Sequence, residues 1–369
     1  MPLLSSPTDA DDKSFMMTAI AVAEQGRLST APNPWVGCVI VKNNRIIGQG
    51  FHQHKGGLHA ERNAIKNLTE SPEGATAYVT LEPCCHFGST PPCTDALIQA
   101  KISRVVVAIG SDPDKQVNGN GVDILKKAGI DVVVGVCEQA ARLSLAPYLY
   151  QRRTERPYVV AKVGMSINGK ISYPDGSSQW ITSVNSRKEG MRIRSESQAI
   201  IVGVNTVLID DPQLTVRDGE YRGILPFLRV VIDPHAKLSM EDHRGLKMVS
   251  DGQGPVLVFT KVLPSTLISG QIEWIQFVDL DSVLKELSSR GVIQVMVEGG
   301  SMTLAKFFDE NLVNHLTCFV APKLIGEGGL SFYSAKSPRS MDGRSKWELV
   351  SSRTVQDGDG DVRLDYRLV

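Results

Sequence analysis

A histidine, an acid and two cysteines in the first half of the chain have the types and order of a catalytic zinc site. The acid is Glu61, two residues after His59, and the cysteines are Cys84 and Cys93. One His and two Cys can hold Zn²⁺ while water takes the fourth position. A glutamate that does not bind the metal can then carry protons between that water and a leaving amine, which is the chemistry of base deamination. Because four residue types fall in the required order, the pattern predicts a zinc-dependent base deaminase.

The long spacing between the two cysteines leaves alternative ligands. Zinc deaminases usually carry C-x-x-C, whereas eight residues separate Cys84 from Cys93. Cys85 and His86 lie in between and are the alternatives. Adjacent cysteines can hardly both reach one tetrahedral ion. Cys93 opens an apolar run at 94–98 that predicts a helix start, where the helix dipole favours a thiolate. We therefore expect Cys84 and Cys93 to be the ligands.

The helix and strand around these residues must bring them to one point. Side chains two residues apart in mid-helix point about 200° apart. His59 and Glu61 can therefore face one ion only from the first turn of a helix, which we expect over 59–68. A strand expected at 77–81 then leads into Glu82. We expect Glu82 to be an exposed acid, with a contact to the metal ligands as the alternative.

Two further segments could contact a substrate. Asn33 stands between two prolines, which impose an extended backbone. Its amide is expected either to recognise the edge of a heterocycle or to form a turn. A loop rich in Gly and Asn at 111–121 is expected either to wrap substrate phosphate and ribose through backbone N–H groups or to be an ordinary surface loop.

Strands and helices alternate along both halves of the chain. In the first half we expect a hairpin turn at Asn43-Asn44, strands at 36–41, 45–51, 77–81, 104–109 and 130–136, and helices at 14–27, 59–68, 94–100, 122–128 and 138–150. After a charged run at 151–157 we expect strands at 158–163, 199–203, 228–232, 256–260, 274–277 and 292–297, helices near 185–196, 281–290 and 302–309, and an antiparallel edge from 347–350 and 362–368. This alternation predicts two α/β domains, 1–150 and 151–369, with largely parallel sheets covered on both faces.

A second group of chemically capable residues lies in the second half, which has no G-x-G-x-x-G. A predicted strand runs into Glu298, two glycines and Ser301. Glycines let the backbone approach a ligand closely, and a helix N-terminus offers N–H groups to phosphate. Lys162 lies on the first predicted strand of this half. Arg194 and Arg217 are expected either to form a fork for a substrate phosphate or to be solvated charges.

The bulk composition limits the kinds of partner. The 369 residues carry 40 Lys and Arg against 40 Asp and Glu, so the chain lacks the basic footprint of a nucleic-acid-binding protein. No apolar run is long enough to cross a bilayer, and the first residues lack the form of a signal peptide. The six cysteines suit a reducing compartment better than a disulfide framework. We expect a cytoplasmic enzyme with a small-molecule substrate, and neither nucleic acid nor membrane as a partner.

Motifs in both halves match one known family. The chain resembles the bifunctional deaminase/reductase of bacterial riboflavin biosynthesis along nearly its whole length, and the matching segments are PNPWVGCVIV, HAERNA, TLEPCCHFGSTPPC, SQWIT, TVLIDDPQLTVR and VEGG. The long spacing between the cysteines is typical of this family. The resemblance implies an N-terminal cytidine-deaminase-like three-layer domain and a C-terminal dihydrofolate-reductase-like domain.

The resemblance also implies substrates, cofactors and site residues. The first domain would deaminate 2,5-diamino-6-ribosylamino-4(3H)-pyrimidinone 5′-phosphate to the aminouracil, and the second would reduce the ribosyl group to ribityl with NADPH. In the first domain Zn²⁺ would be held by His59, Cys84 and Cys93, and Glu61 would carry protons. The residues at the reduction centre would be Lys162, Asp210 and Glu298. The substrate-binding residues, in addition to Asn33, would be Ser178, Arg194, Leu214, Arg217 and Glu298. The NADPH-binding residues would be Gly164, Trp180, Thr206, Asp210, Gly300, Ser301, Met302 and Thr303.

The chain departs from the family pattern at a few positions. Cys85 stands where members usually have serine, Asn168 where they have aspartate, and Asp114-Lys115 where they often have Asn-Pro. None of these departures removes an expected ligand or proton carrier. Three alternative functions are a nucleic-acid-editing zinc deaminase with a non-catalytic accessory domain, a C-terminal half that only binds or regulates, and a purely structural zinc domain. We also expect a homo-oligomer.

Overall fold

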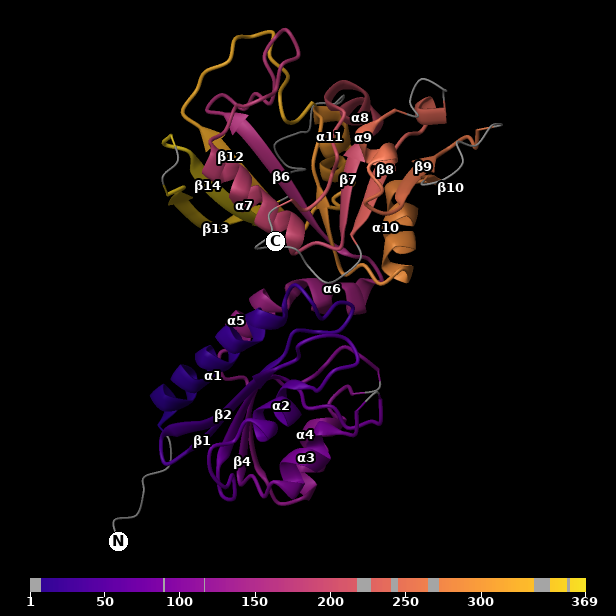
Figure 1. The fold of residues 1–369 in the computed structure, drawn as a ribbon. Coiled ribbons are helices and arrows are strands. Elements are labelled where there is room, and N and C mark those ends of the chain that lie inside the picture. The colour runs from indigo at the N-terminus through magenta and orange to yellow at the C-terminus, as the bar shows by residue number, and fades with distance from the viewer. Residues whose placement is uncertain are drawn as a thin grey trace. The chain divides into compact units, whose positions relative to one another are not determined.

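The chain forms two compact units, Met1–Glu155 and Arg156–Val369, each with its own sheet (Figure 1). The computed structural model describes residues 8–88, 90–115, 117–217, 227–239, 245–264, 272–334, 346–356 and 359–369. Gln116 of the expected loop at 111–121 lies outside these residues. Among the helices described, none combines the length and the apolar character needed to span a membrane.

The first unit is built on a five-stranded sheet with the strand order β2-β1-β3-β4-β5. Its strands are β1 Gly37–Lys42, β2 Arg45–Phe51, β3 Thr76–Leu81, β4 Arg104–Ile109 and β5 Asp131–Val134. β3, β4 and β5 are parallel, as expected. β1 pairs antiparallel with both β2 and β3, so the expectation of parallel pairing does not extend to these strands. The alternation of strands and helices does not reveal that a hairpin joins the sheet in the opposite direction.

Asn43 and Asn44 form the turn between β1 and β2, as expected. Their φ angles are 50° and 58°. A two-residue turn with both central residues at positive φ matches the twist of the strands that it joins. Asn adopts this conformation more readily than most residues, so the prediction from the Asn-Asn pair is confirmed.

Helices cover both faces of this sheet and complete three layers (Figure 1). The helices are α1 Asp9–Ala23, α2 Ala60–Lys66, α3 Cys93–Gln99, α4 Asn120–Lys127, α5 Glu138–Ser144 and α6 Ala146–Thr154. α1 and α5 lie together on one face, and α2, α3 and α4 follow one another on the other face. The single helix expected over 138–150 is two helices, because Pro147 in the first turn of α6 has no N–H to continue the preceding helix.

The second unit is built on a nine-stranded sheet with the order β10-β9-β8-β7-β11-β6-β12-β14-β13. Its strands are β6 Tyr158–Ser166, β7 Ala199–Gly203, β8 Leu228–Ile232, β9 Val256–Thr260, β10 Ile272–Gln276, β11 Gln294–Val297, β12 His315–Ala321, β13 Trp347–Thr354 and β14 Val362–Leu368. The strands from β10 to β12 are parallel. β14 and β13 are antiparallel at the edge, which confirms that prediction. β12 was not expected, because no Gly or Pro marks its start after α11.

Helices cover both faces of this sheet as well. They are α7 Val184–Ser195, α8 Val204–Asp210, α9 Lys247–Ser250, α10 Leu280–Ser289 and α11 Ser301–Asp309. Alternate residues of each strand face opposite sides. Val159 and Ala161 therefore pack with α10 and α11, whereas Val160 packs with α7. On the α7 side, β7 and β8 pack against α8 and α9.

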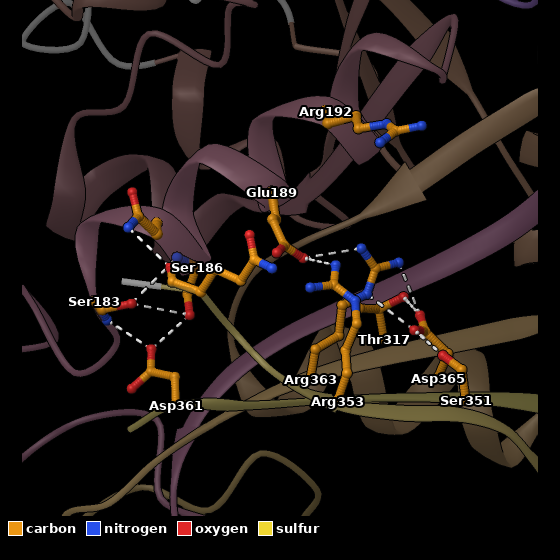
Figure 2. Close-up of polar contacts among 12 residues, drawn as sticks. Ser183, Ser186, Glu189, Arg192, Thr317, Ser351, Arg353, Asp361, Arg363 and Asp365 are labelled. Carbon is orange, nitrogen blue, oxygen red and sulfur yellow. Dashed lines mark hydrogen bonds and ion pairs between the residues drawn. The ribbon is translucent and has the colours of Figure 1, made fainter. Parts of the chain in front are cut away.

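A polar network fastens α7 to the edge of the sheet (Figure 2). The carboxylate of Asp361 accepts hydrogen bonds from the backbone N–H of Ser183 at 2.8 Å and from the hydroxyl of Ser186 at 2.5 Å. One turn further along α7, Glu189 pairs with Arg363 of β14 at 3.1 Å. Charges buried in this way are stabilised only when they are paired and hydrogen-bonded. The network therefore fixes the position of α7 and of the side chains that its last turn carries.

Candidate active sites

His59, Cys84 and Cys93 converge in the first unit. The Sγ atoms of Cys84 and Cys93 lie 3.3 Å and 3.5 Å from the Nδ1 of His59, and the three ligand atoms all lie within 4.8 Å of one another. One nitrogen and two sulfur atoms at these separations suit Zn²⁺ and leave one position open. Within the described ranges no other group of three or more His, Cys, Asp or Glu side chains could hold a metal ion, so Cys85 and His86 are not part of the ligand group.

Each ligand stands at the end of an element. His59 is the N-cap of α2 and Glu61 lies in the first turn, which lets both face one point as expected. Cys84 follows the end of β3, and Cys93 is the first residue of α3. The carbonyl oxygen of Cys84 accepts hydrogen bonds from the backbone N–H groups of Cys93 at 3.0 Å and Thr94 at 3.2 Å. These bonds tie together the two segments that carry the sulfur ligands.

The surroundings favour a thiolate at Cys84 and a carboxyl group at Glu61 that titrates near neutral pH. A hydrogen bond from the Cys93 thiol lowers the pKa of Cys84 to about 4, and His59 acts in the same direction. Burial, followed by the negative charge on Cys84, raises the pKa of Glu61 to about 7. A carboxyl group that exchanges its proton near neutral pH is suited to general acid–base catalysis.

The ligand group opens onto a cavity of about 210 Å³, which Asn33 and Glu61 also line. The Nδ2 of Asn33 lies 3.1 Å from the Nε2 of His52, and the Nδ1 of His52 lies 3.0 Å from the carbonyl oxygen of Leu58. Because a carbonyl can only accept, the proton is on Nδ1, and Nε2 accepts from the Asn33 amide. This leaves the Oδ1 of Asn33 to accept a hydrogen bond from a ligand. His52 was not expected at the site, because it lies on no motif.

Glu82 is not the exposed acid that the sequence predicted. Its side chain is buried and accepts hydrogen bonds from the backbone N–H groups of Asp112 at 3.0 Å, Gly119 at 2.8 Å and Gly121 at 2.8 Å. Three N–H donors stabilise a carboxylate that has lost its water. Glu82 thereby folds the loop that was expected to wrap the substrate and brings Asp112 to the cavity wall.

Lys162, Glu298 and Arg194 form an ionic cluster in the second unit, in which Arg194 is buried and the other two side chains are partly buried. The Nζ of Lys162 lies 2.8 Å from Oε1 of Glu298, and an Nη of Arg194 lies 2.5 Å from Oε2. Burial alone would raise the pKa of Glu298, but the charges of Arg194 and Lys162 outweigh it and lower that pKa to about 2. The glutamate is therefore an ionised partner shared by two cations. Glu298 directly follows β11, Lys162 lies in the middle of β6, and Arg194 lies in the last turn of α7.

Arg194 is not the solvated charge that was one alternative, because its side chain is buried. It donates a second hydrogen bond to the carbonyl oxygen of Thr215 at 2.9 Å. Its Nε is buried and has no hydrogen-bond partner within the described segments, so it can serve a ligand. Arg217 is exposed.

Gly190 of α7 leaves room for the side chain of Lys162. A Cβ at Gly190 would lie 3.0 Å from the Cε of the lysine.

The other residues expected around the reduction centre are less closely connected. Asp210 is the last residue of α8, and burial raises its pKa. As far as the structure describes the chain, its carboxylate makes no hydrogen bond or ion pair, and none joins it to the ionic cluster. Leu214 is buried and has a φ of 55°, and Ser178 is half-buried.

The residues expected to hold NADPH frame the start of α11. The N–H of Gly300 donates to the Oγ1 of Thr206 at 3.2 Å. A Cβ at Gly203 would lie 2.3 Å from the Oγ1 of Thr303, so only glycine permits this approach. The Oγ of Ser301 is buried and has no hydrogen-bond partner in the described part of the chain. An open helix N-terminus with an unused hydroxyl suits a phosphate, so these residues fit a nicotinamide dinucleotide.

Trp180, Gly164 and Met302 complete the set of residues expected to hold NADPH. Trp180 is exposed, and the guanidinium of Arg187 lies 4.3 Å from the centre of its ring. Arg187 was not expected from the sequence. A Cβ at Gly164 would lie 3.3 Å from the Cγ2 of Thr182. Met302 is exposed.

Known families match both halves of the chain. Residues 9–109 match the cytidine and deoxycytidylate deaminase zinc-binding region, and residues 157–358 match the RibD C-terminal domain. The fold is thus a cytidine-deaminase-like domain followed by a reductase domain of the dihydrofolate-reductase type, as expected. A non-catalytic accessory half, which one alternative function requires, is not supported.

Several relatives match the chain across both halves. The riboflavin biosynthesis protein RibD of Chlamydia muridarum is 44% identical over 326 residues, which cover 85% of this chain and 86% of that protein. That of Escherichia coli is 37% identical over 335 residues, with coverages of 85% and 89%. The solved structure of Acinetobacter baumannii RibD has a TM-score of 0.87 at 36% identity and covers 98% of this chain and 100% of its own. A diaminohydroxyphosphoribosylaminopyrimidine deaminase/5-amino-6-(5-phosphoribosylamino)uracil reductase from Thermotoga maritima has a TM-score of 0.87 at 34% identity, with coverages of 98% and 99%. The chain therefore belongs to the RibD family of bifunctional riboflavin-biosynthesis enzymes, which join a zinc-binding deaminase to a reductase and act on small pyrimidines.

Proposed function

We propose that the chain carries out two successive reactions on one pyrimidine ribose phosphate. The first removes an amino group from 2,5-diamino-6-ribosylamino-4(3H)-pyrimidinone 5′-phosphate. The second uses NADPH to reduce the ribosyl group of the resulting aminouracil to ribityl. The name of the Thermotoga maritima relative supports both steps. The observation that carries the proposal is that one chain holds both a convergent His/Cys/Cys group beside a buried glutamate and a separate Lys–Glu–Arg cluster.

In the deaminase site, Glu61 moves the protons. Zinc, when bound to its three ligands, supplies a Lewis acid that makes water nucleophilic near neutral pH. Glu61 takes a proton from the attacking water and returns it to the departing ammonia, because its raised pKa allows exchange in both directions. Asn33, oriented by His52, accepts a hydrogen bond from the edge of the pyrimidine through Oδ1.

In the reductase site, Lys162 and Arg194 contact the substrate. NADPH, when bound, supplies the hydride. The ribosylamine of the substrate can open to an imine, whose carbon accepts it. Lys162 assists proton movement at this imine, and Glu298 holds the lysine in place at 2.8 Å. The unused Nε of Arg194 donates to the substrate, and the segment 300–303 holds the dinucleotide. Fixing the two reactants in this way lowers the entropic cost of the reaction.

A two-step assay of the purified, zinc-loaded chain tests the proposal. Without NADPH, the chain should release ammonia from the diaminopyrimidinone substrate and stop at the aminouracil. With NADPH, oxidation of the cofactor should depend on the deaminated product. Oxidation of NADPH without ammonia release from the first substrate would contradict the deaminase assignment. Ammonia release with no oxidation of NADPH, even after product is added, would contradict the reductase assignment.

Two further expectations concern the surroundings of the enzyme. None of the six cysteines is in a disulfide, which supports a reducing, cytoplasmic location. The homo-oligomer stays a prediction, and the mass of the full chain in solution tests it.

A further inference from the structure

The cavity beside the metal-binding group contains one permanently charged cation. Arg152 of α6 lines it, and no other arginine or lysine of the described residues does so. Ser89 and Gln116, which lie outside the described residues, carry no charge. The substrate proposed above carries a phosphate group, and proteins meet phosphates with charge-assisted hydrogen bonds, preferably from arginine.

Arg152 is held in place yet keeps unused donors. One Nη donates to the carbonyl oxygen of Pro32 at 3.1 Å, and the other donates to the Oε1 of Gln151 at 2.5 Å. The guanidinium lies 5.0 Å from the centre of the Tyr148 ring. Since an arginine has five N–H donors, these two bonds leave several for a ligand. Within the described residues the guanidinium forms no ion pair, so no carboxylate neutralises its charge.

The acidic side chains that line the same cavity are already engaged. Glu82 accepts three backbone hydrogen bonds. Asp112 accepts hydrogen bonds from the Tyr148 hydroxyl and from the backbone N–H of Asp114, both at 2.9 Å. Asp114 is likewise engaged, and Glu61 belongs to the metal-binding group. The carboxylates that line the cavity therefore do not neutralise the charge of Arg152.

Two polar side chains of the lining each have one buried atom without a hydrogen-bond partner among the described residues. The Nδ1 of His86 and the Oγ1 of Thr90 are buried, and neither has a hydrogen-bond partner within the parts of the chain that the structure describes. Buried polar atoms are rarely left unpaired. A polar ligand in the cavity would satisfy them, and a phosphate can accept from a hydroxyl and from an imidazole N–H at the same time.

We propose that Arg152 binds the 5′-phosphate of the substrate in the deaminase site. This inference rests on the proposed function, because it concerns the same substrate. Arg152 acts in binding and takes no part in the proton transfers, which belong to Glu61. It makes the deaminase selective for the phosphorylated pyrimidine over its dephosphorylated nucleoside.

The experiment compares Arg152→Met with the wild type on the phosphorylated substrate and on the dephosphorylated nucleoside. Ammonia release is followed, and the zinc content of each sample is measured. The KM for the phosphorylated substrate should rise roughly 10- to 100-fold with little change in kcat. The KM for the nucleoside should not change. Arg152→Lys keeps a cation and should restore part of the loss.

A matched control is available on the same helix. Arg153 is the exposed neighbour of Arg152 and does not line the cavity, so Arg153→Met should behave as the wild type does. If Arg152→Met fails to fold, Arg152→Gln replaces it, because glutamine can still donate to the carbonyl oxygen of Pro32. The same selective loss is expected.

The results separate this inference from the proposed function. An equal rise in KM for both substrates would overturn the inference, because Arg152 would then only hold Pro32 in position. Unchanged constants on both substrates would overturn it as well. A wild-type chain that deaminates neither compound would instead contradict the proposed function.

Discussion

The Nζ of Lys162 lies 2.8 Å from one carboxylate oxygen of Glu298, while Arg194 holds the other oxygen at 2.5 Å. A strand of the sheet, the end of another strand and a helix on its face thus contribute one charge each to a single cluster. Both cations hold the pKa of the glutamate low against the effect of burial. The cluster holds an ammonium group at a fixed position, which is the role that the proposed reduction gives to Lys162.

Replacing Glu298 by Gln should impair reduction and leave deamination unchanged. Glutamine has the shape of glutamate without its charge, so the buried Arg194 and the partly buried Lys162 would lose their shared counter-charge. We expect the second unit to lose roughly 3 kcal/mol of unfolding free energy and NADPH oxidation to fall roughly 100-fold. Denaturant unfolding and the two-step assay of the full chain measure these effects.

A matched control removes an exposed ion pair instead. Glu348 pairs with Arg367 at 2.6 Å, and Glu348 is exposed while Arg367 is partly exposed. Glu348→Gln should cost less than about 1 kcal/mol and should not change either activity. Reduction at the wild-type rate by Glu298→Gln would contradict the role given to the cluster.

Because the pKa of Glu298 is low, the unfolding free energy of the second unit should depend on pH in the acidic range. The folded pKa of about 2 lies below the ordinary value of 4.5, so the folded state binds fewer protons than the unfolded state between these values. The stabilisation is complete above pH 4.5 and is lost as the pH falls toward 2, up to about 3 kcal/mol. Asp365 acts in the same sense below its ordinary value of 3.8, because hydrogen bonds from His315 and Arg363 outweigh burial and lower its pKa.

Unfolding by urea across this pH range measures the effect. The unfolding free energy should fall more steeply with acid in the wild type than in Glu298→Gln, which lacks the titrating group. Parallel curves for the two proteins would show that the carboxylate of Glu298 does not contribute.

Gly190→Ala should separate stability from catalysis. An alanine in the interior of α7 favours the helix by about 1 kcal/mol relative to glycine. The new Cβ would lie 3.0 Å from the Cε of Lys162, and the flexible lysine must therefore move. We expect a chain at least as stable as the wild type, with NADPH oxidation reduced roughly 10- to 100-fold. Gly245→Ala is the control, because a Cβ there would meet no atom of the described residues within 4 Å. Unchanged reduction in Gly190→Ala would mean that the position of the ammonium is not critical.

Asp361→Asn should weaken the attachment of α7. Both hydrogen bonds, from the N–H of Ser183 and from the hydroxyl of Ser186, go to Oδ2 of this buried carboxylate. An amide oxygen carries no full charge and accepts such hydrogen bonds more weakly. We expect a loss of about 1–3 kcal/mol in unfolding free energy and a lower rate of reduction, because α7 carries Arg194. Asp359→Asn, at an exposed position of the same segment, should change neither. Equal effects of the two substitutions in unfolding experiments would contradict a specific role for the network in Figure 2.

The metal ligands could be predicted from the sequence because they stand close together in it. His59 at a helix start, Cys84 after a strand and Cys93 at the next helix start need only local geometry to converge. The hairpin at Asn43-Asn44 was readable for the same reason. Contacts between distant segments could not be predicted from the sequence. Arg194 and Glu298 are 104 residues apart, and nothing in either motif shows that the arginine pairs with the glutamate.

Burial of polar groups was the other feature of the structure that could not be predicted from the sequence. Glu82 was expected to be exposed, because an acid usually is. Its burial depends on three backbone N–H groups from a loop some thirty residues further along the chain. The strand β12 was missed for a local reason, because no Gly or Pro separates it from α11.

The most direct test of the account is Glu61→Gln in the zinc-loaded full chain, with metal content and ammonia release measured on the same sample. Glu61 lies outside the ligand group, so the variant should retain its zinc, and deamination should fall about 10²- to 10⁴-fold. Reduction of added aminouracil should continue. A zinc-containing Glu61→Gln chain that releases ammonia at the wild-type rate would contradict the account.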